Sequence, residues 1–238
     1  MKRTLLAALS LSLLLGGPAF AGFGIPKVSK GGSKFNTKKV DALLKEIKDV
    51  ENKYRKAKGT LYLQTESFHG IVDKYGNKKL PKLTKPWPIV DKTWTKAKND
   101  KERGSANKLE ATYSKETDTR TKIVDADLKK DAQRKSLKSK LKAPDIKKLK
   151  MVKKESSQLP NRNAAIVKRS TELIKKASMM SVDLGKQAAK NPLKAGDIKR
   201  VKAKLDGGIV RLKKIPPACK KQTMMAKNLT MNVVHLLK

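Results

Sequence analysis

Apolar side chains between residues 40 and 75 recur in two interlocking series, each with a spacing of seven. The first series is Val40, Ile47, Tyr54, Leu61, Phe68 and Tyr75, and the second is Leu43, Val50, Ala57 and Ile71. Steps of three and four residues return to one side of an α-helix, so the pattern predicts one long helix over residues 37–75. The helix is expected to continue across Gly59 and Gly70, although each glycine costs about 1 kcal/mol relative to alanine.

This apolar seam must be covered by something. Later helices of the same chain are one partner, and a second copy of the chain in a homo-oligomer is the other. Tyr54, Phe68 and Tyr75 are bulky for a regular two-stranded coiled coil, which favours packing within the chain. Acid-before-base pairs four residues apart, such as Glu51 and Arg55, are expected to support the helix locally.

Prolines end the predicted helix and indicate a loop over residues 76–92. They are Pro81, Pro86 and Pro88. Because proline cannot occupy a helix interior, residues 85–88 are expected to be extended. The two tryptophans, Trp87 and Trp94, are expected to close one end of the helical core. The alternative is an exposed aromatic loop that contacts a membrane interface or a ligand.

A polar helical region is predicted over residues 93–142, interrupted near Gly104. Beyond it, residues 141–150 match residues 193–202 at seven of ten positions, with an offset of 52 residues. Each copy leads into a short helix, then a proline break at Pro160 or at 216–217, then a longer helix. If this match is a repeat and not chance similarity in lysine-rich sequence, residues 143–238 form two related helical hairpins.

The predicted fold class is therefore all-α. No stretch alternates apolar and polar residues as a strand would. The expectation is a single domain over residues 37–238, built as an elongated antiparallel helical bundle with a long N-terminal helix and two C-terminal hairpins. The clustered methionines are expected to fill gaps in its core, with a Cu(I) site as the alternative: Met179, Met180, Met224, Met225 and Met231.

The N-terminus has the features of a secretory signal peptide over residues 1–21. Lys2 and Arg3 precede an apolar run, and Ala19-Phe20-Ala21 supplies the small residues of a cleavage site. Residues 22–36 are rich in Gly, Ser and Lys and are expected to be a flexible leader. The chain is therefore predicted to be exported to a bacterial periplasm or cell exterior, with no transmembrane segment after cleavage. Its single cysteine, Cys219, is expected to be a buried apolar residue, and a dimer-forming thiol is the alternative.

Positive charge dominates the composition, with 58 Lys and Arg against 21 Asp and Glu and a net charge of +37 at pH 7. Lysine predominates, and its hydrated point charge favours diffuse attraction to polyanions over geometrically demanding recognition. The alternative is a surface that is basic only for solubility. The charge is densest from residue 129 to residue 154, which are the candidate polyanion-binding residues: Lys129, Lys130, Arg134, Lys135, Lys138, Lys140, Lys142, Lys147, Lys148, Lys150, Lys153 and Lys154.

Catalytic motifs are absent from the sequence. It has no His-Glu-x-x-His, no Cys-x-x-Cys, no Gly-rich phosphate loop and no Gly-x-Ser-x-Gly. The two histidines, His69 and His235, are expected to be exposed beside the apolar seams of their helices. No cofactor or metal is predicted, and we expect the protein not to be an enzyme.

Three functions remain as hypotheses. The first is a non-enzymatic envelope protein that binds lipopolysaccharide, anionic lipid, DNA or acidic proteins through its lysine-rich helices, including those after Lys194. The second is a periplasmic holdase-type chaperone for unfolded clients. The third, a small hydrolase with an unrecognised carboxylate pair, is the least favoured by the sparse carboxylates.

Overall fold

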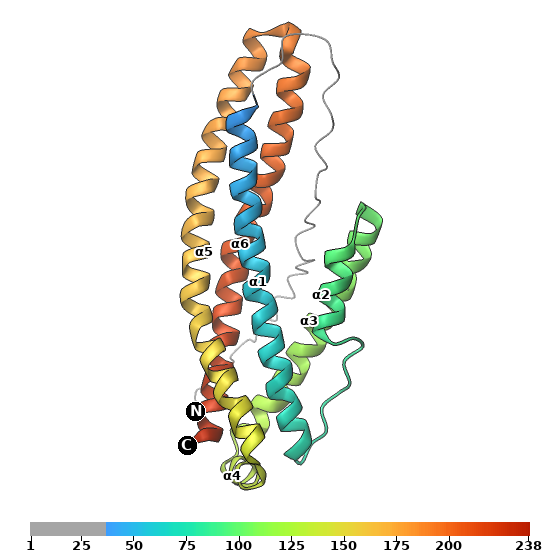
Figure 1. Cartoon of the computed structure of the whole chain (residues 1–238), viewed down its shortest axis with the longest axis vertical. Coiled ribbons are helices and arrows are strands. Elements are labelled where there is room, and N and C mark those ends of the chain that lie inside the picture. The colour runs from blue at the N-terminus through green and yellow to red at the C-terminus, as the bar shows by residue number, and fades with distance from the viewer. Residues whose placement is uncertain (1–36) are drawn as a thin grey trace, which may run out of the picture.

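The computed structural model describes residues 37–238, and this part of the chain forms six α-helices, one 3-10 helix and no strand (Figure 1). In chain order they are α1 (Lys38–Tyr75), α2 (Trp87–Lys96), α3 (Asp100–Leu128), α4 (Asp131–Lys140), α5 (Ala143–Lys190), η1 (Pro192–Lys194) and α6 (Ala195–Leu237). The all-α prediction is confirmed. The signal peptide and leader predicted for residues 1–36 lie outside the described residues.

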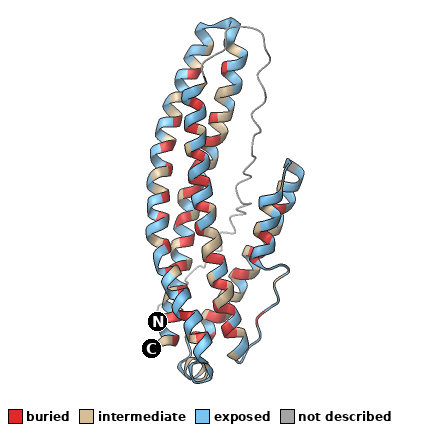
Figure 2. Cartoon of the chain, viewed as in Figure 1, coloured by how far each residue is buried: buried red, intermediate tan, exposed pale blue. Residues whose placement is uncertain are grey.

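Helices α5 and α6 form one long antiparallel hairpin, and α1 lies along it (Figure 1). The side of α5 that faces its neighbours repeats every seven residues. Its inward positions at this spacing are Leu149, Ser156, Asn163, Ser170, Ala177 and Leu184. At about 1.5 Å per residue, the 48 residues of α5 make a rod of roughly 70 Å. Figure 2 shows buried residues on the facing sides of the three helices and exposed residues on the outer sides.

The apolar seam of α1 packs against α5 and α6, as the packing-within-chain interpretation requires. Every residue of the two predicted series is buried except Tyr75, which is half-buried. The Tyr75 hydroxyl instead donates a hydrogen bond of 2.6 Å to Asp145. Gly208 of α6 allows a close approach, since a Cβ there would lie 3.0 Å from Ile47 Cδ1.

Five of the buried α5 side chains are polar, and three of them, Ser156, Asn163 and Ser181, bond to α6. The Ser156 hydroxyl lies 2.8 Å from that of Thr230. The Asn163 amide donates to the Cys219 carbonyl at 3.3 Å and to the Thr223 hydroxyl at 3.2 Å. The hairpin interior therefore contains hydrogen bonds that are made only in one alignment of α5 and α6.

Helices α2 and α3 form a second, shorter hairpin that diverges from the rod along its length (Figure 1). Near the end of α3, Val124 and Leu128 join the main core. Further up, a separate aromatic cluster of Tyr62, Trp87 and Tyr113 connects α1, α2 and α3.

Ion pairs reinforce this connection between α3 and α1. Glu110 of α3 is 5% exposed and pairs with both Arg55 and Lys58 of α1. Arg55 also donates to Asp91 of α2 at 2.7 Å, and its guanidinium lies 3.7 Å from the centre of the Trp94 ring. The contact of α1 with α2 and α3 is therefore rich in charge and aromatic rings.

The predicted proline breaks at Pro160 and at 216–217 are wrong. Helices α5 and α6 continue through all three prolines, so residues 143–238 form one hairpin of two long helices and not two hairpins. Packing along both helices outweighs the local cost of a proline, which is a missing N–H and a steric clash with the preceding turn. The two matching segments, 141–150 and 193–202, both lie at the beginnings of long helices.

Two boundaries between residues 76 and 142 also differ from the prediction. The loop ends at Pro86, and Trp87 begins α2 with Pro88 in the first turn, where a missing N–H costs nothing. The interruption predicted near Gly104 lies instead at residues 97–99, where Asn99 caps α3 by accepting a hydrogen bond from the Glu102 N–H.

The predicted exposure of His69 and the predicted burial of the methionines need correction. His69 is only 2% exposed, and its Nε2 lies 3.3 Å from the Thr121 hydroxyl of α3. His235 is exposed, as predicted. Met180 and Met225 pack against the core, but three methionines of the two clusters lie on the outer faces of α5 and α6: Met179, Met224 and Met231.

Candidate functional site

The twelve candidate basic residues lie on α4, the segments that flank it and the first three turns of α5, at one end of the rod. We call this set the α4–α5 basic surface. Eleven of its members are exposed lysines, and the twelfth, Arg134, is half-buried. The surface follows the outside of two helices and is not a pocket.

Helical spacing explains why these side chains point outward. In α4 only Leu137 is buried among the described positions; Gln133, Arg134 and Ser136 are half-buried, and the remaining positions of this short helix face solvent. In α5 the inward positions are Asp145, Leu149 and Val152, and the lysines lie between them on the opposite side. The exposure of this surface therefore follows from the apolar spacing alone.

Acidic side chains do not neutralise the α4–α5 basic surface. Arg134 pairs with Asp131, and Lys140 donates to the Tyr75 carbonyl at 3.4 Å. Asp145 turns inward, where the Tyr75 hydroxyl and Lys74 hold the pKa of its carboxyl below its usual range. Within residues 37–238, no carboxylate lies within ion-pair distance of the eleven lysines.

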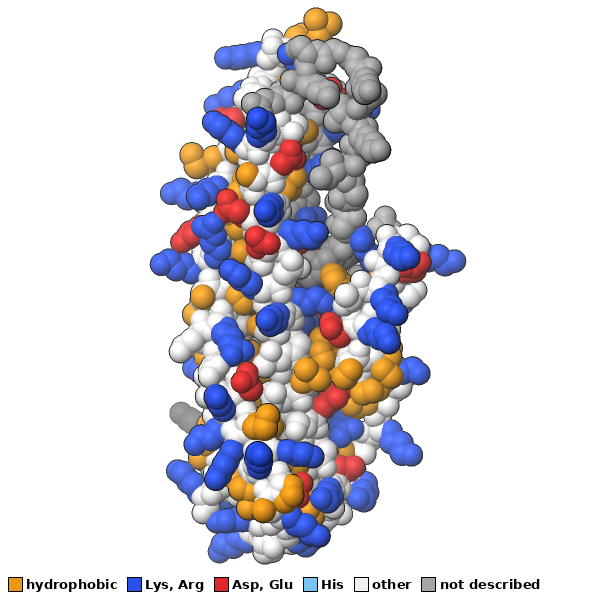
Figure 3. Space-filling view, in the orientation of Figure 1, with side chains coloured by type: hydrophobic (Ala, Val, Ile, Leu, Met, Phe, Trp, Pro, Cys, Tyr) orange, Lys and Arg blue, Asp and Glu red, His pale blue; other side chains and the backbone are white. Residues whose placement is uncertain are grey.

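Most carboxylates of residues 37–238 are also occupied by contacts within the chain. Those that pair with a base or accept a hydrogen bond from another residue are Asp41, Glu46, Glu51, Glu66, Asp73, Asp91, Glu102, Glu110, Glu116, Asp118, Asp125, Asp131, Asp145, Glu155, Glu172, Asp197 and Asp206. Figure 3 shows the consequence on one face, where Lys and Arg side chains project along the whole length of the molecule. The acids stabilise the fold, and most of the lysines remain available to a partner.

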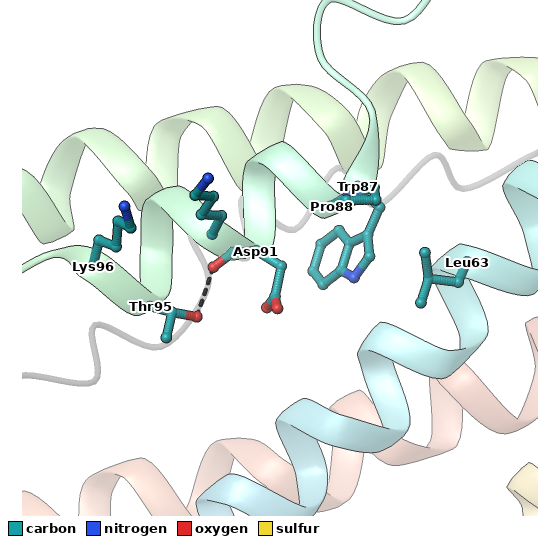
Figure 4. Close-up of a pocket in the computed structure, with 7 residues that line it drawn as sticks. Leu63, Trp87, Pro88, Asp91, Thr95 and Lys96 are labelled. Carbon is teal, nitrogen blue, oxygen red and sulfur yellow. Dashed lines mark hydrogen bonds between the residues drawn. The ribbon is translucent and has the colours of Figure 1, made fainter.

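A second feature, the α1–α2 groove, lies where α2 diverges from α1. It is lined on the α2 side by Trp87, Pro88 and Asp91, and on the α1 side by Gly59 and Leu63. In Figure 4 the Trp87 indole and the Asp91 carboxylate point from α2 into the space between the two helices, and Leu63 borders this space on α1 beside Trp87. The part of this space that includes Gly59 and is lined by both helices has a volume of about 460 Å³.

This groove was not predicted from the sequence, although three of the residues that form or flank it stood out there. Trp87 and Trp94 were expected to close one end of the helical core, with an exposed aromatic loop as the alternative, and Gly59 was treated as a cost to α1. Trp87 is 1% exposed and packs in the aromatic cluster with Tyr62 and Tyr113, while the Trp94 Nε1 donates to Asn107 at 3.1 Å. The groove depends on the angle between α1 and α2, for which the sequence has no local signal.

No protein-family model matches the chain, and neither a curated protein nor a solved structure is significantly similar to it.

Few side chains in the part of the chain that the structure describes could bind a metal ion or take part in a redox reaction. Residues 37–238 contain no cluster of three or more His, Cys, Asp or Glu side chains that could hold a metal ion. Burial raises the pKa of the Cys219 thiol to about 11, which keeps it protonated. Burial, with a further contribution from Arg120, lowers the pKa of His69 to about 3.

Charged positions recur along even the longest helices. Among the helices of residues 37–238, none combines the length and the apolar character needed to cross a bilayer.

Proposed function

We propose that the protein is a non-enzymatic, exported envelope protein that binds anionic surfaces or polymers through its lysine-rich helices, and above all through the α4–α5 basic surface. The observation that carries this proposal is that most acidic side chains of residues 37–238 have partners within the chain and the lysines of this surface have no acidic partner there. Most carboxylates are engaged in contacts within the fold, whereas the eleven exposed lysines of the α4–α5 basic surface have no acidic partner among residues 37–238. A net charge of +37 then attracts polyanions over a Debye length of about 8 Å at physiological salt.

Lysine ammoniums on flexible stems favour a partner with repeated negative charges and no fixed geometry. Lipopolysaccharide, anionic lipid surfaces, DNA and acidic proteins share this property. Binding of this kind releases counterions, so the affinity falls steeply and log-linearly with salt concentration. A solubilising surface would produce no saturable binding at physiological salt.

The test is retention of the exported chain on lipopolysaccharide, anionic vesicles and DNA across a salt series. The surface variant replaces Lys138, Lys147, Lys150 and Lys154 with Gln. The matched control makes the same charge change in the middle of the rod, at Lys48, Lys53, Lys168 and Lys175, all of which are exposed. The surface variant should reduce the magnitude of the slope of log affinity against log salt by about three to four, because each removed ammonium neutralises about one negative charge of the polymer.

Equal losses of affinity in the two variants would contradict a localised binding surface and leave only general charge attraction. Absence of saturable binding to any of the three anions at about 150 mM salt, which is physiological ionic strength, would contradict the proposal itself.

A holdase-type chaperone is the second candidate, and exposed methionines favour it. Met151, Met179, Met224 and Met231 are each more than half exposed on α5 and α6. Flexible thioether side chains adapt to varied apolar partners and are common on promiscuous binding surfaces. This function predicts that the chain suppresses aggregation of a chemically unfolded protein, and that part of the effect survives high salt. Loss of all suppression at high salt would contradict it.

A further inference from the structure

We propose that the α1–α2 groove is a binding subsite for an acidic saccharide, a sugar unit that carries a phosphate or carboxylate group. The proposal deepens the proposed function by naming a class of ligand, and it rests on that function only for the ligand's source, an anionic envelope polymer. Unlike the α4–α5 basic surface, this groove has fixed geometry. It combines one rigid hydrogen-bond donor, an apolar wall and a rim of cations.

The rigid donor is the indole N–H of Trp87. The ring packs against Tyr62 and Tyr113, with ring centres 4.7 and 5.4 Å away, and its backbone N–H donates to Glu66. Among residues 37–238, no acceptor lies within hydrogen-bond distance of its Nε1. The Nε1 is not one of the fully buried polar atoms, so it reaches the groove, and an acceptor oxygen from a ligand would take the place of solvent at this fixed donor.

Gly59 leaves the space in front of this donor open. It lies in the interior of α1, where glycine costs about 1 kcal/mol relative to alanine. A Cβ at residue 59 would lie 3.4 Å from Trp87 Nε1, close to the place that an acceptor oxygen would occupy at about 2.9 Å. Gly70, in the same helix, has no atom within 4 Å of its Cβ position. Of these two glycines, only Gly59 has a neighbour, the Trp87 indole, within van der Waals contact of its Cβ position.

Apolar and polar groups surround the donor in the mixture that sugars require. Leu63 is 44% exposed and forms the apolar wall with Pro88. Figure 3 shows apolar side chains gathered on the exposed surface where α2 borders α1. Hydroxyl and amide groups come from Thr60, Thr95 and Asn52. The hydroxyls of Thr60 and Thr95 donate to backbone carbonyls, and their oxygens still accept from a sugar.

The charge at the groove selects an acidic ligand. Its acid, Asp91, is paired with Arg55 at 2.7 Å, and Arg55 is also bound to Glu110. Three exposed lysines remain on the rim, Lys56 on α1 and Lys92 and Lys96 on α2. These ammoniums attract phosphate or carboxylate, while the indole N–H and the apolar wall orient the sugar to which it is attached.

The experiment follows the two indole N–H resonances of the isotopically labelled exported chain by NMR, with a Trp94→Phe variant to assign them. The probes are glucose 6-phosphate, glucuronate, glucose and inorganic phosphate. Both acidic sugars should shift the Trp87 indole resonance saturably, with glucose and phosphate each at least fivefold weaker. Gly59→Ala should weaken binding of the acidic sugars at least tenfold, and Gly70→Ala, the matched control, should leave it unchanged.

Trp87→Phe keeps the aromatic packing and removes the donor; followed through the backbone amide resonances of the groove, it should weaken binding about fivefold. Equal affinities of Gly59→Ala and Gly70→Ala would overturn the proposal. So would equal binding of glucose, or of inorganic phosphate, and the latter would reduce the groove to a simple anion site.

The experiments distinguish a failure of the groove proposal from a failure of the proposed function. The glutamine variant of the α4–α5 basic surface should still bind glucose 6-phosphate, and Gly59→Ala should still adsorb to lipopolysaccharide at low salt. A surface variant that loses the sugar would show that the groove is not an independent site.

Discussion

Lowering the pH from 7.5 to 5.0 tests the burial of His69, because the folded and unfolded chains bind protons at different pH. In the unfolded chain a histidine has a pKa near 6.5, whereas burial in the folded chain lowers the pKa of His69 to about 3. The stabilisation from keeping His69 neutral is therefore complete above pH 6.5. It is lost as the pH falls toward 3, since the unfolded state takes up the proton first.

The magnitude follows from these two pKa values. Between pH 7.5 and 5.0 the unfolded state gains about 2 kcal/mol relative to the folded state, at about 1.4 kcal/mol per pH unit below 6.5. The Thr121 hydroxyl, 3.3 Å from Nε2, is the only hydrogen-bond partner of the ring among the described residues, and no carboxylate compensates the charge of a protonated ring.

The assay is urea unfolding at both pH values for the wild type, His69→Gln and His235→Gln. The exposed His235 serves as the matched control. His69→Gln should lose about 2 kcal/mol less stability on acidification than the wild type and His235→Gln. Carboxylates that titrate near pH 5 contribute equally to all three and cancel. Identical pH dependence of wild type and His69→Gln would refute the argument that His69 is buried and neutral.

Three further predictions concern the core. Glu110→Ala should cost about 3 kcal/mol by urea unfolding, because it leaves Arg55 and Lys58 half-buried without their shared carboxylate; a loss below about 1 kcal/mol would contradict this. Pro160→Ala should stabilise the chain by up to about 3 kcal/mol by restoring a backbone N–H within α5, and unchanged or lower stability would count against it. Cys219 should resist thiol reagents in the folded chain and react at once in urea, and rapid labelling without denaturant would contradict its burial.

The fold could be predicted as far as local spacing determines it. The seam of α1 was visible because every third or fourth residue is apolar, and it continued across Gly59 and Gly70 as expected. Pro160 misled the prediction because packing against α6 stabilises α5 through a position that is locally unfavourable. Spacing along one helix describes what that helix prefers and not what its neighbours contribute.

Contacts between distant helices were the part that the sequence could not specify. Glu51 and Arg55 have favourable spacing on α1, yet Glu51 pairs with Arg211 of α6 at 2.8 Å, and Arg55 pairs with α2 and α3. His69 looked exposed from its position beside the seam, but α3 covers it. The same distinction applies to the candidate sites. The exposed lysines were predictable from the spacing along one helix, whereas the α1–α2 groove depends on how two helices pack and was not predictable.

The hydrogen bonds inside the α5–α6 hairpin resist longitudinal sliding. Moving one helix along the other by a single turn would withdraw the Asn163 amide from the Cys219 carbonyl and Thr223, and would separate Ser156 from Thr230. Purely apolar seams tolerate such shifts, because one leucine replaces another. A force that pulled the two helices in opposite directions along the rod would have to break these hydrogen bonds together, so the amide and hydroxyl groups hold α5 and α6 in a single register.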